Sequence, residues 1–232
     1  MKDLIIVGAT RQASTRCKNK MVRKFGDTTL FDLYMQKLET LNRYSVKPYK
    51  KIILSLYPGD TTLWDIAQTY NIPIQERDEF SARRGELLSD ILNYLNKYHN
   101  KYVMWLNSSL PFLQPTTIKD AAEYFHTFDN IEGLEPVKPR YNWFWMPNNN
   151  QPITVADKSH TRTQDALCIY ESVHAFHIFN RKYMLKNDAY YNFTKDNPHL
   201  FIVEDTVEFF DINTEKDFKV AENIYVTQQG GI

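Results

Sequence analysis

The chain has 232 residues, of which 43% are hydrophobic, so it is long enough to bury a sizeable core as one large α/β domain or two small ones. Its 28 Lys and Arg residues balance its 28 Asp and Glu residues, which argues against nucleic-acid binding through bulk positive charge but still allows a local basic pocket. The two cysteines, Cys17 and Cys168, lie far apart in sequence and indicate neither a disulfide framework nor a zinc site.

The sequence lacks the long apolar segments that targeting or membrane insertion requires. The apolar core near the N-terminus is the four-residue run LIIV, which is too short for a signal peptide. No window approaches the roughly 20 apolar residues that a membrane-spanning helix needs. We therefore predict a soluble, cytoplasmic protein with no membrane partner.

Strand-like and helix-like segments alternate along the first half of the chain. Strands are expected at residues 4–9, 50–58, 72–78 and 102–107, and helices at residues 28–41, 61–70, 85–99 and 116–128. In the first of these helices, leucines from Leu30 to Leu41 recur at helical spacing behind a cap at Asp27 or Thr28. This order predicts an α/β fold, with a doubly wound, mainly parallel sheet covered by helices on both faces.

The alternation stops beyond residue 130. Residues 140–157 are typical of two strands around an Asn/Pro turn, residues 168–180 and 200–205 of further strands, and residues 209–226 of a strand end, a cap and a last helix. The sequence shows no linker, repeat or low-complexity tract. We predict a single domain over residues 1–232 with an inserted β-hairpin region at about 136–165.

The loop behind the first strand, residues 8–20, is rich in cations and hydroxyls. It contains Arg11, Arg16 and Lys20 together with Ser14 and Thr15. Ligands of parallel sheets bind at the carboxyl ends of the strands, where this loop emerges, and a triphosphate needs such cations close to backbone N–H donors. Charge alone is equally compatible with a solvated surface loop, and the chain contains neither a P-loop motif nor a GxGxxG turn.

The motif in this loop is more specific than its charge. The segment ATRQASTRCKNKM resembles the loop A-R-x-x-S-T-R-x-x-x-K of the sugar-activating cytidylyltransferases, in the version found in enzymes that activate Kdo. Residues 106–121, 161–179 and 209–224 follow in the family's order and resemble the LQPTSPLRxxxDI, RRQDLPxxYxxNGAIYIF and SIDIDTxxDFxxAExI motifs of the acylneuraminate (CMP-sialic acid synthetase) branch. A fainter match at 76–86 corresponds to the family's pyrimidine pocket. The resemblance covers nearly the whole chain and implies the Rossmann-like nucleotidyltransferase fold.

The resemblance also implies a role for individual residues. It places CTP against Ala9, Arg11, Ser14, Thr15, Arg16, Lys20, Arg77 and Ala82, with Lys20, Arg11 and Arg16 catalytic because they would neutralise the leaving phosphates. It places the acceptor against Asn107, Ser108, Arg140, Arg162, Gln164, Asp165 and His174. Arg162 would pair with the carboxylate of the acceptor. Asp211 and Asn213 would coordinate Mg²⁺, the implied cofactor, through hard oxygen ligands.

The implied reaction transfers CMP from CTP to a small acidic acceptor and releases pyrophosphate, as in the activation of sugars for cell-surface polysaccharides. A nonulosonic, sialic-like acid is the first expectation, with Kdo or a non-sugar acid as alternatives. In the related enzymes the hairpin region contacts a second subunit, so a homodimer is expected, with no nucleic-acid partner. The chain departs from the family motifs at Asn213 (usually Asp), Ser109 (Asp in the Kdo enzymes), Arg84 (usually Asp) and His174 (glycine in NGA).

Two other classes of protein stay open at this stage. A glycosyltransferase with the same doubly wound fold usually carries D-x-D after its fourth strand, where this chain has Asn107-Ser108-Ser109. The lost acidic residues would also suit a catalytically inactive nucleotide- or sugar-binding module.

Three further features have simpler explanations. His174 and His177 are three apart on an expected strand, so they should face opposite sides and form a poor metal pair; satisfied, partly buried histidines are the preferred interpretation. Neighbouring cations could lower the pKa of Cys17, but an inert thiol is expected. The aromatic run at 141–146 suits a core or a dimer contact better than a base-stacking surface.

Overall fold

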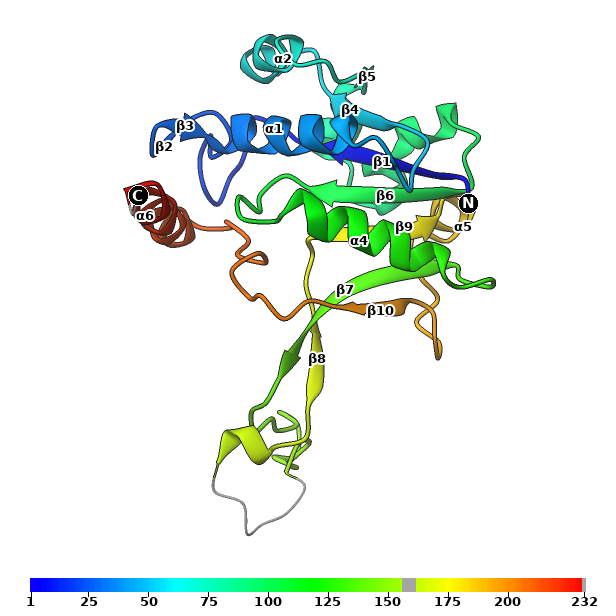
Figure 1. The fold of residues 1–232 in the computed structure, drawn as a ribbon, viewed down its shortest axis with the longest axis vertical. Coiled ribbons are helices and arrows are strands. Elements are labelled where there is room, and N and C mark those ends of the chain that lie inside the picture. The colour runs from blue at the N-terminus through cyan, green and yellow to red at the C-terminus, as the bar shows by residue number, and fades with distance from the viewer. Residues whose placement is uncertain (156–161, 231–232) are drawn as a thin grey trace.

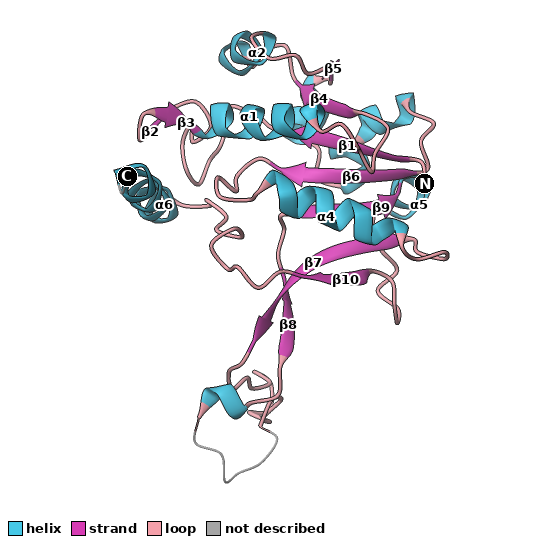
Figure 2. Ribbon diagram, viewed as in Figure 1, coloured by secondary structure: helices cyan, strands magenta, loops and turns pink. Residues whose placement is uncertain are grey.

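The structure is a computed structural model that describes residues 1–155 and 162–230. At its centre, seven strands follow the order β10–β7–β9–β6–β1–β4–β5 and an eighth, β8, pairs with β7 (Figure 1). The strands are β1 (Leu4–Ala9), β4 (Ile52–Leu56), β5 (Ile74–Glu76), β6 (Tyr102–Asn107), β7 (Gly133–Arg140), β8 (Ile169–Ser172), β9 (Phe176–Asn180) and β10 (His199–Ile202), with β2 (Lys24–Phe25) and β3 (Thr28–Thr29) forming a separate small hairpin. The helices are α1 (Leu30–Arg43), α2 (Thr61–Gln68), α3 (Leu88–Ile91), α4 (Pro115–His126), α5 (Arg181–Asn187) and α6 (Glu215–Gly230) (Figure 2).

The sheet is mainly parallel and has a core on each face. Strands β5, β4, β1 and β6 are parallel neighbours, whereas β9 runs antiparallel to both β6 and β7. All residues of β1 are buried, as expected for a strand covered on both faces. Leu4 and Ile6 pack with residues of α1, α2 and α4, whereas Ile5 and Val7 pack with residues of α5 and of the 3-10 helix Asn93–Lys97. The predicted fold class is confirmed.

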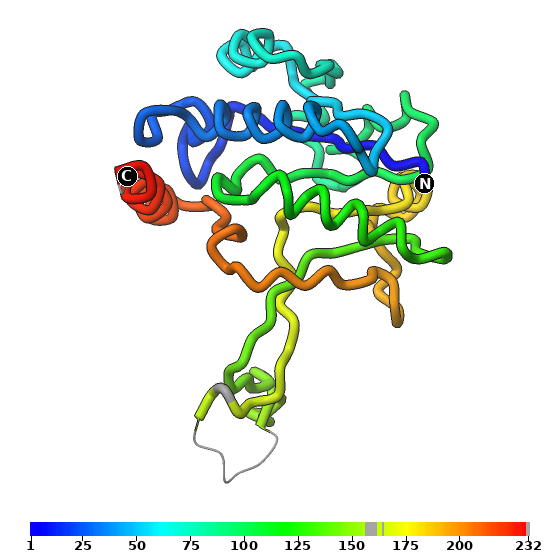
Figure 3. The backbone as a smooth tube through the Cα atoms, in the orientation of Figure 1, coloured from blue at the N-terminus to red at the C-terminus, as the bar shows by residue number. Residues whose placement is uncertain are grey.

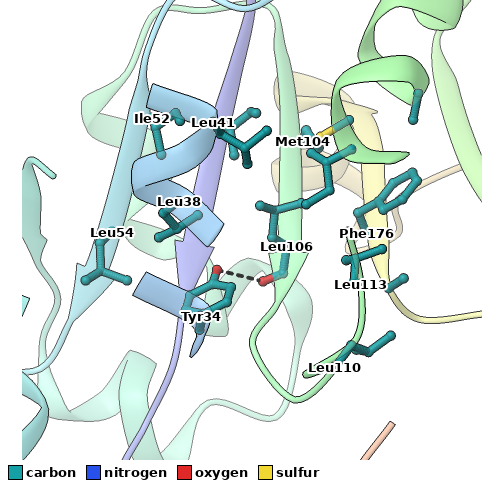
Figure 4. Packing of buried hydrophobic residues seen from close by; sticks show 14 of the residues in the cluster. Tyr34, Leu38, Leu41, Ile52, Leu54, Met104, Leu106, Leu110, Leu113 and Phe176 are labelled. Atoms are coloured by element: carbon teal, nitrogen blue, oxygen red, sulfur yellow. Dashed lines mark hydrogen bonds between the residues drawn. The ribbon is translucent and has the colours of Figure 1, made fainter. Parts of the chain in front are cut away.

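Helix α1 covers the sheet through one apolar stripe. Tyr34, Leu38 and Leu41 point from this helix towards side chains of β4 and β6 (Figure 4). The helix begins directly after Thr29, whose hydroxyl accepts a hydrogen bond from the Asp32 N–H at 3.0 Å. The cap therefore lies one residue later than the predicted Asp27/Thr28 pair. No helix in the described ranges is both long and apolar enough to cross a membrane.

The predicted helix at 85–99 is wrong as a single element. It consists of the short α3 and the 3-10 helix Asn93–Lys97. The Asn93 amide donates to Asp78 at 3.1 Å and the Asn96 amide donates to the Asn93 carbonyl at 3.0 Å. Asparagine side chains that bond in this way compete with α-helical backbone hydrogen bonds, which explains the break.

The second half contains one missed strand and several corrected ones. Strand β7 was not predicted; it contains Pro136 and Pro139, residues that are uncommon inside a sheet, yet it pairs with β8, β9 and β10. The expected strand at 168–180 is split into β8 and β9 by a turn in which the Ala175 N–H donates to the Val173 carbonyl at 2.8 Å. The expected strand end at 209–210 is irregular.

Strands β7 and β8 form an arm that projects from the sheet (Figure 3). Gly133 and Leu134 still pair with β9, whereas Val137 to Arg140 pair with β8. At the tip, the two predicted strands of 140–157 reduce to one bridge between Trp145 and Pro152 over the described part of that segment; residues 156–157 lie outside it. Prolines, and the lack of a neighbouring strand among the described residues, account for the short pairing. The predicted insertion at about 136–165 thus begins inside β7.

Candidate active site

A cavity of about 620 Å³ lies at the carboxyl ends of β1 and β6. It is where a ligand of a parallel sheet is expected to bind. Its lining includes all the residues predicted to contact the nucleotide or the metal, and three of those predicted to contact the acceptor: Ala9, Arg11, Ser14, Thr15, Arg16, Lys20, Arg77, Ala82, Asn107, Ser108, His174, Asp211 and Asn213. Residues more than two hundred positions apart in the sequence therefore share one site.

Buried contacts hold the basic loop in place. Asp60 is only 2% exposed, and one of its oxygens accepts a hydrogen bond from the Gln12 N–H at 3.1 Å. Its other oxygen accepts from Arg83, which lines the cavity, at 2.9 Å. The Arg77 guanidinium, also buried, donates to the carbonyl of Thr10. Asp60 thus links the loop to the π-helical turn Phe80–Arg84.

Sequence analysis missed the role of Asp60 and of Arg83. Only the Gly59-Asp60 break before a helix was visible in the sequence. A buried carboxylate bonded to an N–H 48 residues away is a tertiary feature that local patterns do not indicate. An acid placed at the end of the second parallel strand, on the edge where ligands bind, was the available signal.

The cavity is strongly cationic. Among the described residues, its lining contains five cationic side chains, which belong to Arg11, Arg16, Lys20, Arg77 and Arg83, and one carboxylate, that of Asp211. Burial lowers the pKa of Lys20, while nearby Asp211 opposes this shift by favouring the charged form. Burial also lowers the pKa of the Arg77 guanidinium, which nevertheless stays charged because arginine side chains are not deprotonated in proteins. Such a site suits a polyanion.

The segment before α6 brings an acid to the same cavity. The Asp217 carboxylate, in the first turn of this helix, accepts from the N–H groups of Asn213 at 3.1 Å and Thr214 at 2.7 Å, while the Thr214 hydroxyl accepts from the Asp217 N–H at 3.2 Å, which forms a capping box. The Asn213 amide donates to one oxygen of Asp211 at 2.9 Å, and its own oxygen accepts from Arg16 at 2.8 Å. Packing of Phe218 against Phe25, with ring centroids 5.3 Å apart, anchors α6 beside the basic loop.

The arrangement fits a Mg²⁺ ion bound chiefly through Asp211. The Oδ1 atom of Asp211 is buried and has no hydrogen-bond partner among the described residues. The same part of the chain holds no cluster of three His, Cys, Asp or Glu side chains suited to a metal. Because Mg²⁺ is commonly held by one or two carboxylates plus substrate phosphates and water, one open carboxylate oxygen is sufficient. The Asn213 oxygen is already engaged by Arg16.

Three residues predicted to contact the acceptor, Asn107, Ser108 and His174, line the part of the cavity that we call its acceptor side. The Asn107 side chain donates to the His174 carbonyl at 2.8 Å and accepts from the Ser109 N–H at 2.9 Å. Ser108 and Ser109 follow on the same loop. This loop is also held by Lys37, whose side-chain nitrogen donates to the Leu110 carbonyl at 2.8 Å. The backbone around the predicted acceptor residues is thus well held.

The other predicted acceptor residues lie on the arm. Arg140 pairs with Glu171 across the arm. Arg162, exposed, and Asp165 lie at a 3-10 turn, Thr163–Asp165, near the tip, whereas the side chain of Gln164 is outside the described part of the structure. The described lining of the cavity includes none of these four residues. The structure therefore divides the predicted site into two groups.

Two smaller predictions are corrected by the structure. His174 and His177 do not face opposite sides: their rings touch, with Nδ1 of His174 3.2 Å from Nε2 of His177, because the turn at 173–175 places His174 before the strand. Cys17 is buried, and this burial raises the pKa of its thiol instead of lowering it. The expectation of an inert thiol agrees with that shift.

No model of a known protein family matches the chain. A curated protein, the CMP-N,N'-diacetyllegionaminic acid synthase of Campylobacter jejuni subsp. jejuni serotype O:2, is 32% identical over 74 residues. The match spans 32% of this chain and only 30% of that relative.

Solved structures match over almost the whole chain. A CMP:2-keto-3-deoxy-manno-octonic acid synthetase complexed with CTP has a TM-score of 0.69 at 10% identity, covering 98% of this chain and 100% of the other. A 4-diphosphocytidyl-2C-methyl-D-erythritol synthase from Anaerococcus prevotii has a TM-score of 0.64 at 11% identity, covering 97% and 98%, respectively. A cytidylyltransferase from Leptospira borgpetersenii serovar Hardjo-bovis has a TM-score of 0.58 at 14% identity, covering 100% and 96%.

The chain therefore has the Rossmann-like nucleotidyltransferase fold that these cytidylyltransferases share. Its similarity to the sugar-activating members, inferred above from ordered motifs, is supported by the legionaminic acid synthase match.

Proposed function

We propose that this protein is a CTP-dependent cytidylyltransferase that transfers CMP to a sugar acid and releases pyrophosphate, with a nonulosonic acid as the preferred acceptor. One observation carries the proposal: five cationic side chains and one open carboxylate oxygen converge on a cavity at the carboxyl ends of the parallel strands. This combination suits a triphosphate and its metal ion. The ordered motifs and the fold similarity agree with it.

The residues divide the chemistry as follows. The acceptor hydroxyl attacks the α-phosphorus in line with the departing pyrophosphate, forming one P–O bond and breaking another. Arg11, Arg16 and Lys20 neutralise the charge that develops on the leaving phosphates. Asp211 would hold Mg²⁺, which would supply further charge neutralisation. Because little covalent work falls to the protein, positioning and electrostatics dominate.

The pyrimidine is proposed to lie near Arg77 and Ala82. The Arg77 guanidinium donates to Thr10, while its buried Nε has no partner among the described residues. A buried donor without a partner is costly, so a ligand carbonyl there would be bound favourably. Ala82, on the π-helical turn, leaves room for a flat ring.

The acceptor carboxylate is proposed to bind Arg162 from a second copy of the chain. Arg162 does not line the described cavity of its own chain, and the arm that carries it projects from the sheet. The arm also exposes large apolar side chains, among them Tyr141 and Trp145, each 55% exposed. Exposed apolar surface of this kind marks interaction sites, so a homodimer that exchanges arms would both cover it and complete the acceptor pocket.

The function is tested by incubating the protein with CTP, Mg²⁺ and pyrophosphatase and measuring phosphate across a panel of acids. The panel contains a nonulosonic acid, Kdo and a non-sugar hydroxy acid, and ATP, GTP and UTP replace CTP in parallel reactions. We expect phosphate release with CTP and one sugar acid. If none of the acids in the panel leads to phosphate release, a nucleotide-binding module without this activity is the remaining interpretation. If the protein instead turns over a nucleotide sugar in a separate assay, it is a glycosyltransferase.

A further inference from the structure

Three side chains form a line that leads from the core to the acceptor side of the cavity. The Tyr191 hydroxyl donates to the Leu134 carbonyl at 2.8 Å. Nδ1 of His177 lies 3.1 Å from that hydroxyl, and Nε2 of His177 lies 3.2 Å from Nδ1 of His174. Tyr191 and His177 are buried, whereas His174 is exposed and lines the cavity. We refer to these three residues as the histidine relay.

Hydrogen-bond donors and acceptors fix the direction of this relay. A backbone carbonyl can only accept, so the single hydrogen of the Tyr191 hydroxyl is used on Leu134. His177 must then donate from Nδ1 to the tyrosine oxygen, which leaves its Nε2 as an acceptor when the ring is neutral. His174 must therefore donate from Nδ1, and its remaining nitrogen, Nε2, carries a free lone pair.

The surroundings of His177 keep it neutral and immobile. It is 1% exposed, and it stacks on Tyr190 with ring centroids 4.4 Å apart and planes 12° apart. Burial, aided by the neighbouring His174, lowers the pKa of His177 to about 3. Tyr191 is also buried, and its ring packs directly on Gly133. The contact is so close that a Cβ atom at position 133 would lie only 2.5 Å from the ring.

We infer that His174 is the general base of the transfer reaction, and that His177 and Tyr191 are positioning residues that hold its Nε2 lone pair towards the cavity. This inference rests on the proposed function. The acceptor hydroxyl gives its proton to Nε2 of His174 while its oxygen bonds to the α-phosphorus and the bond to pyrophosphate breaks. The imidazolium ring then returns the proton to solvent, which the exposed position of His174 allows.

The backbone at this position supports the role. The Asn107 amide, at the end of β6, donates to the His174 carbonyl at 2.8 Å, so the strand edge and the base are held together. The related sialic-acid motif has glycine here, so the side chain and its relay distinguish this chain from the motif. A general base contributes about 10²- to 10⁴-fold to a rate, which is large enough to measure.

Activity measurements provide the first test. His174→Ala should lower kcat with the sugar acid by roughly 10²- to 10⁴-fold, leave the Kd for CTP within about twofold, and be partly rescued by added imidazole. Tyr191→Phe should lower kcat less, because His177 keeps its place but loses its fixed tautomer. His99→Ala, an exposed histidine away from the cavity, is the control and should match wild type. A His174→Ala enzyme with wild-type kcat, or one that imidazole does not rescue, would show that His174 is not the general base.

Nitrogen-15 NMR of the histidine rings provides a test that needs no turnover. Wild type should show a protonated Nδ1 and an unprotonated Nε2 on both His174 and His177 near neutral pH, and Tyr191→Phe should shift the His177 signals. A proton on Nε2 of His174 would overturn the relay even if the enzyme is active. If no acid gives phosphate release, the proposed function fails and the base role fails with it, whereas the ring signals still decide the relay.

Discussion

The cavity and the arm hold their predicted residues in opposite ways. Around the cavity, side chains from β1, β6 and the segment before α6 are fixed by a buried sheet and by bonds such as those of Asp60 and Asn213. The arm has two paired strands, a tip with a single described bridge, and exposed aromatic side chains. An isolated two-stranded hairpin is marginally stable in water. Within one chain, the residues of the cavity are therefore held by buried contacts, whereas those of the arm lie on an exposed hairpin.

The largest effect is expected when the acid that lines the cavity is removed. Asp211→Ala should lower pyrophosphate release by about 10³-fold or more, because the only open carboxylate oxygen in the described lining of the cavity is lost. CTP should still bind weakly through the loop cations. Turnover assays measure the loss of pyrophosphate release, and calorimetry measures the remaining affinity for CTP.

The control for this variant is Asp205→Ala, which removes an exposed acid that does not line the described cavity. Its activity should equal that of wild type. Full activity of Asp211→Ala would show that the metal binds elsewhere or is not needed. Both proteins should unfold near the wild-type temperature.

On the arm, Arg162→Ala should raise the KM for the acceptor and leave that for CTP nearly unchanged. Loss of a paired guanidinium–carboxylate contact corresponds to about 3 kcal/mol, or roughly 150-fold in affinity. Steady-state kinetics with each substrate varied in turn gives the two values. Gln151→Ala, another exposed change at the tip, should leave both values unaltered. Equal losses for both substrates would instead make Arg162 structural.

Mixing two defective chains tests whether the arm acts on its own cavity or on that of a partner. In an exchanged homodimer, a chain with Asp211→Ala and a chain with Arg162→Ala together form one intact site. At an acceptor concentration far below the KM of Arg162→Ala, where neither variant alone is active, co-expression should then restore roughly a quarter of wild-type activity, because half of the dimers are mixed and each has one working site of two. If each arm served its own chain, every site would keep one defect and no activity would return.

Among the strands, the sequence predicted β1, β4 and β6 well because each is a short apolar run. It failed at β7, a strand that contains Pro136 and Pro139 and so lacks a typical strand pattern, but that pairs with neighbouring strands along its length. It also failed at the turn between β8 and β9, because the residues around Val173 favour extended backbone and nothing local signals the turn. Both failures lie where the sheet gives way to the arm.

The site shows the same division. Motifs located the loop cations and Asp211, and the structure brings them together in one cavity. They could not show Asp60, whose contacts come from distant segments, or the contact between His174 and His177, which depends on where the strand begins. Sequence patterns report the residues that chemistry requires, whereas the side chains that position them depend on tertiary packing.

Removal of a single cation from the basic loop should have a smaller effect. Lys20→Ala and Arg11→Ala should each weaken CTP binding roughly 10- to 150-fold, the equivalent of about 1.5–3 kcal/mol for a charge-assisted hydrogen bond. Lys18→Ala is a matched control, since Lys18 is exposed on the same loop but does not line the described cavity. Calorimetry with CTP measures the affinity of each of the three variants. Equal affinities for all three variants would remove the main support for a phosphate site.

The smallest effect is expected from Asn213→Asp. The change replaces the amide that donates to Asp211 with a second carboxylate, so without metal it places two like charges side by side, and with Mg²⁺ it offers another oxygen ligand. Arg16, which already contacts this side chain at 2.8 Å, would partly offset the added charge. We expect the Mg²⁺ concentration for half-maximal activity to fall by roughly threefold, at a cost of well under about 1 kcal/mol in the free energy of unfolding measured without metal. If this Mg²⁺ concentration rises or stays unchanged in the variant, residue 213 acts through Arg16 alone. Asp211 would then be the sole ligand that this segment offers to the metal.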